Sequence, residues 1–128
     1  MDKPQIDVSI VVPAYNEEQA IGGVLDDLVA VMEGSDTSCE IIVVDDGCTD
    51  DTCRICEGYP QVQVIAHGRN RGNGAARTTG VKAARGRYVV MIDADATYPT
   101  DVIPQMVREL EHYDMVIGAR KREMGTLK

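Results

Sequence analysis

The sequence contains no Trp and no Phe, so its 44% of hydrophobic residues are aliphatic side chains, Cys and five Tyr. Such a composition suits a buried sheet with helices packed on it. The chain also has no apolar run near the about 20 residues that a membrane-spanning helix needs. Its first residues, 1–7, are polar, unlike a signal peptide. We therefore expect one domain over residues 1–128, in the cytoplasm, with peripheral membrane association left open.

Basic residues are scarce in the first half of the chain. Residues 1–64 carry 2 basic and 14 acidic side chains, and residues 65–128 carry 11 basic and 7 acidic ones. The two halves therefore have charges of −12 and +4, which sum to the formal net charge of −8. An acidic protein repels the phosphate backbone of nucleic acids at long range. We therefore do not expect nucleic acid as a partner.

A second close pair of cysteines is also missing. The four cysteines are Cys39, Cys48, Cys53 and Cys56, and only the last two form a C-x-x-C pair. Structural zinc sites usually combine two such pairs. Reduced thiols on a helix and its flanks are therefore the favoured interpretation, and zinc binding or a redox pair is the alternative.

Short apolar runs alternate with amphipathic segments along the chain. We expect strands at 6–12, 40–44, 62–65, 88–92 and 114–118. We expect four helices. The first opens at Asn16, and the second spans about 50–57 with Thr49 as its N-cap. The third spans 75–84, and the fourth starts at Pro99 and Thr100. The first helix has apolar residues at helical spacing, namely Ile21, Val24, Leu25, Leu28 and Met32. The pattern predicts an α/β domain with a largely parallel sheet and helices on both faces.

Polar segments follow four of the five predicted strands. They are residues 13–17 after the first strand, 45–47 after the second, 93–95 after the fourth and 119–122 after the fifth. Pro13 is expected to end the first strand, because proline lacks the N–H that pairing needs. Ligands of open α/β sheets bind outside the carboxyl ends of the strands. One ligand could therefore contact all four segments.

Asp93 and Asp95 close the fourth predicted strand. A turn at this point can direct both carboxylates towards one ion, and a hard divalent cation relieves their mutual repulsion. Oxygen ligands suit Mg²⁺ or Mn²⁺, and such an ion would stabilise a diphosphate as a leaving group. The alternative is a solvated acidic turn that caps the helix beginning near Pro99.

The first and second strand ends each allow two interpretations. Asp46 can accept hydrogen bonds from a base or a ribose, or it can cap the next helix beside Gly47, which supplies a positive φ. Tyr15 offers a stacking face and Glu17 a carboxylate. Alternatively, the same residues simply form the acidic first turn of a helix, which the helix dipole favours.

The stretch 69–87 contains six cationic residues and no acidic one. Gly72 and Gly74 lie just before a helix, where backbone N–H groups can hold phosphate oxygens. Helical geometry leaves several of the later charges as solvated surface. We expect His67 to be a loop residue and not a catalyst. A second cationic cluster, 120–122, suits bidentate phosphate binding or is an exposed basic turn.

Taken in order, these segments resemble the family-2 glycosyltransferases of the GT-A fold, and most closely the polyprenyl-phosphate sugar synthases. The segments are VSIVVPAYNEE at 8–18, EIIVVDDGCTDDT at 40–52, NRGNGAARTTG at 70–80, GRYVVMIDADATYP at 86–99 and DMVIGAR at 114–120. Together they cover nearly the whole chain. Two positions depart from the pattern: Cys48 stands where Ser is common, and Thr97 where mannose synthases often have Gln.

The resemblance implies a role for particular residues. The nucleotide pocket would be lined by Pro13, Tyr15, Glu17, Val44 and Asp46. The Mg²⁺ or Mn²⁺ ion and the diphosphate would be held by Asp93, Ala94 and Asp95. Arg120 would contact a phosphate group of the donor or the acceptor, so Asp93, Asp95 and Arg120 are the expected catalytic residues.

The reaction implied is the inverting transfer of a hexose from a GDP- or UDP-sugar to an acceptor such as a polyprenyl phosphate at a membrane surface. A phosphate acceptor is already anionic, so a strong general base is less necessary than with an alcohol. Family members continue beyond the 114–120 segment into an acceptor-binding region, whereas eight residues follow Arg120 here. We therefore expect donor binding to survive better than turnover.

Two other functions compete with this hypothesis. A non-catalytic nucleotide-sugar-binding module would share the pocket and lack the acceptor site. A phospho-accepting response-regulator-like domain has a similar length, but it needs an acceptor Asp after the third strand. This chain has Ile65, Ala66 and His67 at that place, which disfavours the second alternative.

Overall fold

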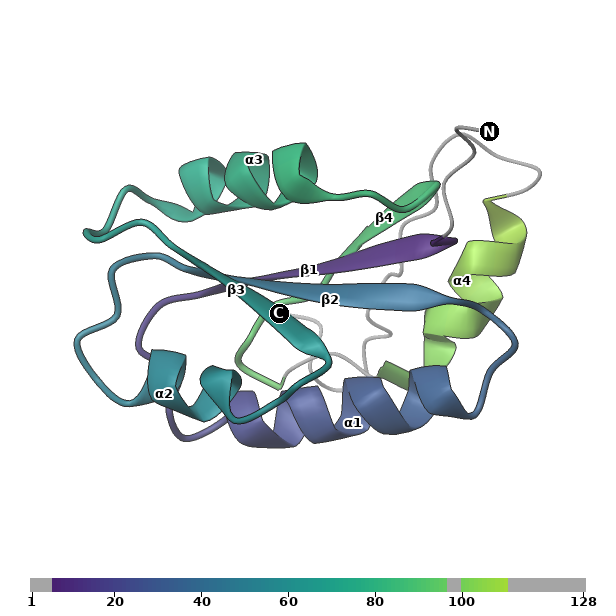
Figure 1. Cartoon of the computed structure of the whole chain (residues 1–128), viewed down its shortest axis with the longest axis horizontal. Coiled ribbons are helices and arrows are strands. Elements are labelled where there is room, and N and C mark those ends of the chain that lie inside the picture. The colour runs from purple at the N-terminus through teal and green to yellow at the C-terminus, as the bar shows by residue number, and fades with distance from the viewer. Residues whose placement is uncertain (1–5, 97–99, 111–128) are drawn as a thin grey trace, which may run out of the picture.

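The computed structural model describes residues 6–96 and 100–110, and over them strands and helices alternate (Figure 1). The strands are β1 (Val8–Ala14), β2 (Cys39–Asp45), β3 (Val62–Ala66) and β4 (Tyr88–Met91). The helices are α1 (Ile21–Glu33), α2 (Thr52–Glu57), α3 (Asn73–Ala83), the 3-10 turn η1 (Thr100–Val102) and α4 (Ile103–Glu109). The strand expected at 114–118 lies outside the described residues.

The four strands form one parallel sheet in the order β3-β2-β1-β4. β1 is buried along its whole length, and β2 is buried from Glu40 onwards. Uninterrupted burial is typical of parallel strands that are covered on both faces. The predicted α/β fold with a parallel sheet is therefore confirmed.

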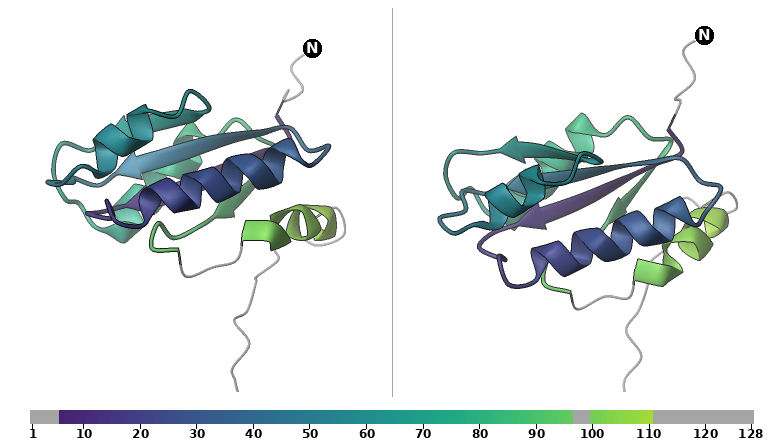
Figure 2. Two further views of the ribbon diagram at one scale, coloured as in Figure 1. Left: turned by 90° about the horizontal axis from the view of Figure 1, so that it is seen from below. Right: turned by 60° about the horizontal axis from the view of Figure 1, so that its bottom comes forward.

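Helices cover both faces of this sheet (Figures 1 and 2). On one face α3 covers β1 and β2, where Ala76 packs with Val11, Ile42 and Val44. On the other face lie α1, α2 and α4, around a larger apolar core. The buried side of α1 consists of the five residues predicted from their spacing: Ile21, Val24, Leu25, Leu28 and Met32. Within the described ranges, no helix combines the length and apolarity that crossing a membrane requires.

Close contact between α3 and the sheet depends on a glycine. A Cβ atom at Gly80 would overlap Cγ1 of Val11 in β1. A larger residue at this position would therefore push α3 away from the sheet, because protein interiors have little free volume. The first residues of α3 border the candidate site, so this packing also fixes the position of the pocket wall.

β1 does not end at Pro13, contrary to the expectation. The strand continues to Ala14, and Pro13 lies opposite Val44 of β2. The backbone N–H and C=O groups of alternate residues in a strand point to the same neighbouring strand. The carbonyl of Val11 accepts the N–H of Ile92, so the backbone of Val11 points towards β4, and so does that of Pro13 two residues later. Since β4 ends at Met91, the missing N–H of Pro13 points beyond the ladder and removes no strand pairing.

The helix boundaries after β1 and β2 were also wrong. α1 begins at Ile21 and not at Asn16, which has a positive φ of 52°. The side chain of Asn16 instead accepts the N–H of Thr49 at 2.8 Å and donates to its Oγ1 at 3.2 Å. Thr49 is therefore not an N-cap. α2 begins at Thr52, whose N–H is bonded to Oδ1 of Asp50 at 2.9 Å.

Candidate functional site

A pocket of about 430 Å³ opens at the carboxyl edge of the sheet. Its walls come from the ends of β1, β2 and β4 and from the loop that leads into α3. It is lined by Pro13, Ala14, Tyr15, Glu17, Asp46, Asn70, Gly72, Asn73, Ala76, Asp93, Ala94 and Asp95. The polar segments after three of the strands thus meet in one place, as expected. The segment 119–122 lies outside the described residues.

Most of the residues singled out from the sequence line this pocket. They are Pro13, Tyr15, Glu17, Asp46, Asp93, Ala94 and Asp95. Val44 is not on the pocket wall, because its side chain is fully buried against Val11, Ile42 and Ala76 beneath α3. Arg120 lies outside the described residues.

One wall of the pocket is acidic. Asp93 and Asp95 are exposed, whereas Ala94 between them is 3% exposed and belongs to the core. Ala96 follows with a φ of 65°, so the chain turns sharply after the second carboxylate. Burial, and then the negative charge of Asp95, raises the pKa of Glu17 above its ordinary value of 4.5. Asp93 and Asp95 therefore lie close enough to Glu17 to repel its carboxylate.

These donors fit a hard divalent cation that is shared with a bound ligand. Among residues 6–96 and 100–110, no three Asp, Glu, His or Cys side chains converge as metal ligands. Mg²⁺ typically binds through one or two carboxylates together with waters and substrate phosphates, not in a cage made by protein alone. Asp93 and Asp95 could supply those carboxylates. A cation there would also relieve the repulsion that raises the pKa of Glu17.

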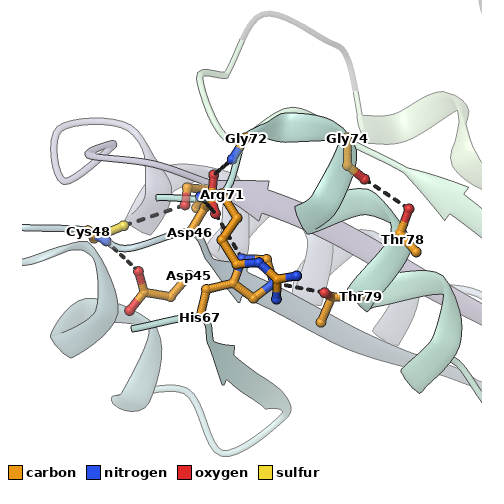
Figure 3. A network of polar contacts seen from close by, with 10 residues as sticks. Asp45, Asp46, Cys48, His67, Arg71, Gly72, Gly74, Thr78 and Thr79 are labelled. Carbon is orange, nitrogen blue, oxygen red and sulfur yellow. Dashed lines mark hydrogen bonds and ion pairs between the residues drawn. The ribbon is translucent and has the colours of Figure 1, made fainter. Parts of the chain in front are cut away.

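A buried carboxylate lines the pocket at the end of β2, on the other side of β1 from the acidic turn after β4, and Figure 3 shows its contacts. Asp46 is 3% exposed, and its Oδ1 lies 2.8 Å from Nδ1 of His67 and accepts the N–H of Arg71 at 2.8 Å. Its Oδ2 accepts the N–H of Gly72 at 3.0 Å. Burial alone would raise the pKa of Asp46, but these hydrogen bonds outweigh it and hold the pKa below 3.8. An ionised Asp46 therefore holds the loop before α3 against the end of β2.

His67 connects Asp46 to α3. Its side chain is 4% exposed, and its Nε2 lies 2.7 Å from Oγ1 of Thr79 in α3. The backbone N–H of His67 donates to the carbonyl of Asp45, which continues the pairing of β3 with β2. His67 does not line the pocket, and the structure places it as a link between Asp46 and α3. The sequence carried no signal of this link, because its three members are far apart in the chain.

Gly47 brings the turn after β2 against the loop after β3. Its φ is +81°, and a Cβ atom at this position would overlap the peptide bond between Arg69 and Asn70. The predicted positive φ of Gly47 is therefore confirmed. This contact helps to place Asn70 on the pocket wall, which Asn73 also lines. Both residues were missed from the sequence, although their amide groups can donate and accept hydrogen bonds.

The cysteines are free thiols outside the pocket lining. Burial raises the pKa of Cys56 to about 12, and burial together with Asp45 raises the pKa of Cys48 and Cys53 to about 11. They are therefore protonated and unreactive at neutral pH. Sγ of Cys48 accepts the N–H of Asn16 at 3.3 Å and donates to the carbonyl of Ala14 at 3.5 Å. A structural role in this turn agrees with the favoured interpretation.

Comparison with known families finds one match over nearly the whole chain. The model of "Glycosyl transferase family 2" matches residues 9–127. Dodecaprenyl-phosphate galacturonate synthase of Rhizobium johnstonii is 36% identical over 95% of this chain and 38% of its own length. Dolichyl-phosphate beta-glucosyltransferase of Drosophila melanogaster is 38% identical over 93% of this chain and 42% of its own length. The chain thus spans about two fifths of the length of these relatives.

Solved structures with the same arrangement of strands and helices include two with bound metal and nucleotide. Glucosyl-3-phosphoglycerate synthase from Mycobacterium tuberculosis, in complex with Mn²⁺, UDP and glucosyl-3-phosphoglycerate, has a TM-score of 0.69 and 30% identity. The match covers 83% of this chain and 40% of that one. Mannosyltransferase PcManGT from Pyrobaculum calidifontis, in complex with GDP-Man and Mn²⁺, has a TM-score of 0.67 and 31% identity, over 84% of this chain and 33% of that one.

Proposed function

Because the chain belongs to glycosyl transferase family 2 and adopts its GT-A fold, we propose that its pocket binds a nucleotide-diphospho-sugar donor together with Mg²⁺ or Mn²⁺. The reaction proposed is the inverting transfer of a hexose from a GDP- or UDP-sugar to a polyprenyl phosphate. The observation that carries this proposal is the meeting of Asp46 on one wall with Asp93 and Asp95 on the other, in one pocket. Family membership removes the response-regulator alternative.

The nucleoside would bind between the ends of β1 and β2. The ring of Tyr15 is 47% exposed at the pocket wall, which leaves a face for stacking on a base. Oδ2 of Asp46 accepts one hydrogen bond within the described structure, from Gly72. A carboxylate oxygen has two acceptor positions, so the second remains for an N–H of the base or a ribose hydroxyl. The fixed orientation of Asp46 makes this acceptor preorganised.

The diphosphate would bind between the acidic turn and the start of α3. Asp93 and Asp95 would hold the cation, which supplies charge neutralisation to the diphosphate as it leaves. Gly72 and Asn73 line the pocket, so the N-terminus of α3 also faces the proposed diphosphate site. The positive end of a helix dipole favours an anion at this place. Ala94 holds the turn in the core, so the backbone that carries the two carboxylates needs little reorganisation on binding.

The acceptor is proposed from the relatives, which are named for dodecaprenyl phosphate and dolichyl phosphate. We propose that residues 1–128 form the donor-binding part and that Arg120 contacts a phosphate group. A phosphate oxygen of the acceptor is already anionic, so the positioning of the donor carries more of the reaction than proton removal does. A module that binds the donor without transfer is the less favoured alternative.

Thermal unfolding with GDP-, UDP-, dTDP- and CDP-sugars, each with and without Mn²⁺, tests donor binding. We expect one nucleotide to stabilise the protein when the cation is present, by about 2.7 kcal/mol at a ligand concentration about one hundred times its Kd. Asp95→Ala should abolish this effect. Asp101→Ala removes an exposed acid outside the pocket and should leave it intact. A stabilisation that persists in chelator would contradict the metal role.

A second experiment separates the enzyme from the binding module. Labelled GDP-mannose or UDP-glucose is incubated with a polyprenyl phosphate and Mn²⁺, and the lipid product is extracted and counted. Formation of a labelled lipid supports the transferase. Metal-dependent donor binding without any transfer would favour the module.

A further inference from the structure

The two helical layers of the protein carry opposite charges. Residues 15–57, which contain α1 and α2, have twelve acidic side chains and a single basic one, Arg54. Residues 58–92, which contain α3, have six basic side chains and no acidic one. α3 lies on one side of the sheet, and α1 and α2 lie on the other (Figure 1). The asymmetry along the sequence therefore becomes a difference between two faces of the molecule.

The outward side of α3 and the loop before it form what we call the basic face. It consists of Arg69, Arg71, Arg77, Val81 and Lys82, all of which are exposed. α3 turns Ala76 and Gly80 towards the sheet, so the residues of the helix that belong to the basic face point away from it. Val81, between the cations of α3, is 47% exposed.

The cations of the basic face form no ion pair with the other residues that the structure describes. Of the six basic residues in this stretch, Arg85 pairs with Glu40 at 3.1 Å, and Arg87 lies 5.2 Å from the ring centre of Tyr88. The part of the chain that the structure describes provides no acidic side chain within ion-pair distance of the other four. These four charges are therefore available to an external anionic partner.

We propose that the basic face docks the protein on an anionic lipid bilayer. Cationic side chains beside a negatively charged membrane each strengthen binding about fivefold, and an exposed aliphatic side chain among them suits the lipid interface. The acidic layer would face away from the membrane, so the separation of charge between the two layers orients the protein on the surface. The basic face has no aromatic side chain on which nucleic-acid bases could stack, which disfavours a single-stranded nucleic acid as its partner.

Docking by this face would bring the pocket beside the bilayer. Gly72, Asn73 and Ala76 line the pocket, and Arg71 and Arg77 of the basic face are their immediate neighbours in the chain. The inference rests on the proposed function in this respect, because a polyprenyl phosphate acceptor lies in a membrane. The membrane contact itself requires neither donor nor metal.

Flotation with vesicles tests the proposal. Vesicles of phosphatidylcholine with about one third phosphatidylglycerol should carry the protein at low salt, and pure phosphatidylcholine vesicles should not. Arg77→Gln and Lys82→Gln should each weaken binding about fivefold, and the double variant about 25-fold. Arg54→Gln is the matched control, since it changes the net charge equally but lies on the acidic layer, 79% exposed. It should bind as the unchanged protein does.

Three results would overturn the proposal: no binding to the anionic vesicles, equal loss of binding in Arg54→Gln, or binding of a single-stranded RNA in preference to the vesicles. Thermal unfolding with donor and Mn²⁺, without vesicles, is measured on the same variants. Arg77→Gln should keep the donor stabilisation, since Arg77 does not line the pocket. If the unchanged protein does not bind the anionic vesicles but is stabilised by the donor, the docking alone is rejected. If it binds the vesicles but is not stabilised by the donor, the donor site alone is rejected.

Discussion

The two ends of β2 each place a buried carboxylate beside α3, and the two carboxylates are used differently. Glu40, near the start of the strand, accepts the N–H of Arg85 at 2.7 Å, just after α3 ends. Asp46, one residue past the strand, accepts the N–H groups of Arg71 and Gly72, just before α3 begins. α3 is therefore fastened at both ends to the same strand.

The environment of the two carboxylates differs. At the amino edge, Oγ of Ser9 donates to Glu40 at 2.6 Å and accepts the N–H of Gly86 at 2.8 Å, and a Cβ atom at Gly86 would overlap Ser9. This network is closed, because both carboxylate oxygens of Glu40 are already hydrogen-bonded to Ser9 or Arg85. At the carboxyl edge Asp46 also lines the pocket. The comparison teaches that one arrangement can stabilise the fold at one edge and shape a binding wall at the other.

The largest effect is expected from Glu40→Ala. The change leaves the buried hydroxyl of Ser9 and the N–H of Arg85 without their acceptor, so the free energy of unfolding should fall by about 3 kcal/mol. Urea unfolding measures this loss. Glu109→Ala, which removes an exposed acid from α4, is the control. The fraction that remains folded should bind the donor with an unchanged Kd. A raised Kd would contradict the claim that Glu40 stabilises the fold without shaping the binding site.

Asp46→Asn should affect both stability and binding. The amide keeps the shape of the side chain but loses the charge that three donors share, so unfolding should become easier by about 2 kcal/mol. Because the loop before α3 would loosen, the Kd for the donor should rise at least about tenfold, which is about 1.4 kcal/mol. Titration with the stabilising nucleotide and Mn²⁺ measures the Kd for the donor. An unchanged Kd would show that Asp46 only stabilises the fold.

Acid should weaken both ends of β2 together. Hydrogen bonds outweigh burial and lower the pKa of Glu40 and of Asp46 below their ordinary values of 4.5 and 3.8. The stability that these carboxylates contribute is therefore complete above about pH 5 and is lost as the pH falls through the lowered folded-state pKa values. Urea midpoints measured from about pH 7 down to about pH 3 detect the loss.

The same acid series should be flatter in Glu40→Ala and in Asp46→Asn, because each variant lacks one of the titrating groups. We expect the loss in the unchanged protein at about pH 4 to be smaller than that caused by Glu40→Ala, since only part of each carboxyl is protonated there. Identical pH profiles in all three proteins would contradict the assignment.

The smallest effect is expected from Thr79→Val, which tests the link from α3 to the pocket. The change keeps the volume and removes the partner of Nε2 of His67, so unfolding should become easier by about 1 kcal/mol. The donor Kd should rise only a few-fold, because His67 still contacts Asp46. The control is Thr78→Val, whose hydroxyl bonds the Gly74 carbonyl within α3, on the exposed side (Figure 3). Equal increases of the donor Kd in both variants would contradict a specific role of the contact between Thr79 and His67 in donor binding.

The sequence predicted the fold well where the pattern depends on neighbours along the chain. The buried side of α1 followed from helical spacing, and the strands followed from short apolar runs. The positive φ of Gly47 followed from turn chemistry. Pro13 and Thr49 were misjudged because tertiary contacts decide both. Pro13 faces the side on which β4 has already ended, and Thr49 is bonded to the side chain of Asn16.

The candidate site divides in the same way. Seven of the residues singled out from the sequence line the pocket, because polar residues at the ends of parallel strands must gather at one edge. Val44 was expected there too, but strand alternation turns it under α3. The contacts of His67 with Asp46 and Thr79 had no sequence signal, since they join the ends of β2 and β3 to the middle of α3.

What the sequence determined by itself is the order of strands and helices, the family, and the set of polar residues that meet at the carboxyl edge. Local spacing is enough for these, because backbone periodicity and strand direction are properties of short segments. The tertiary structure alone decided which carboxylates are buried, which loop each one holds, and that the acidic and basic stretches become opposite faces. Those outcomes depend on groups distant in the chain being brought within hydrogen-bond or packing distance, which no local pattern encodes.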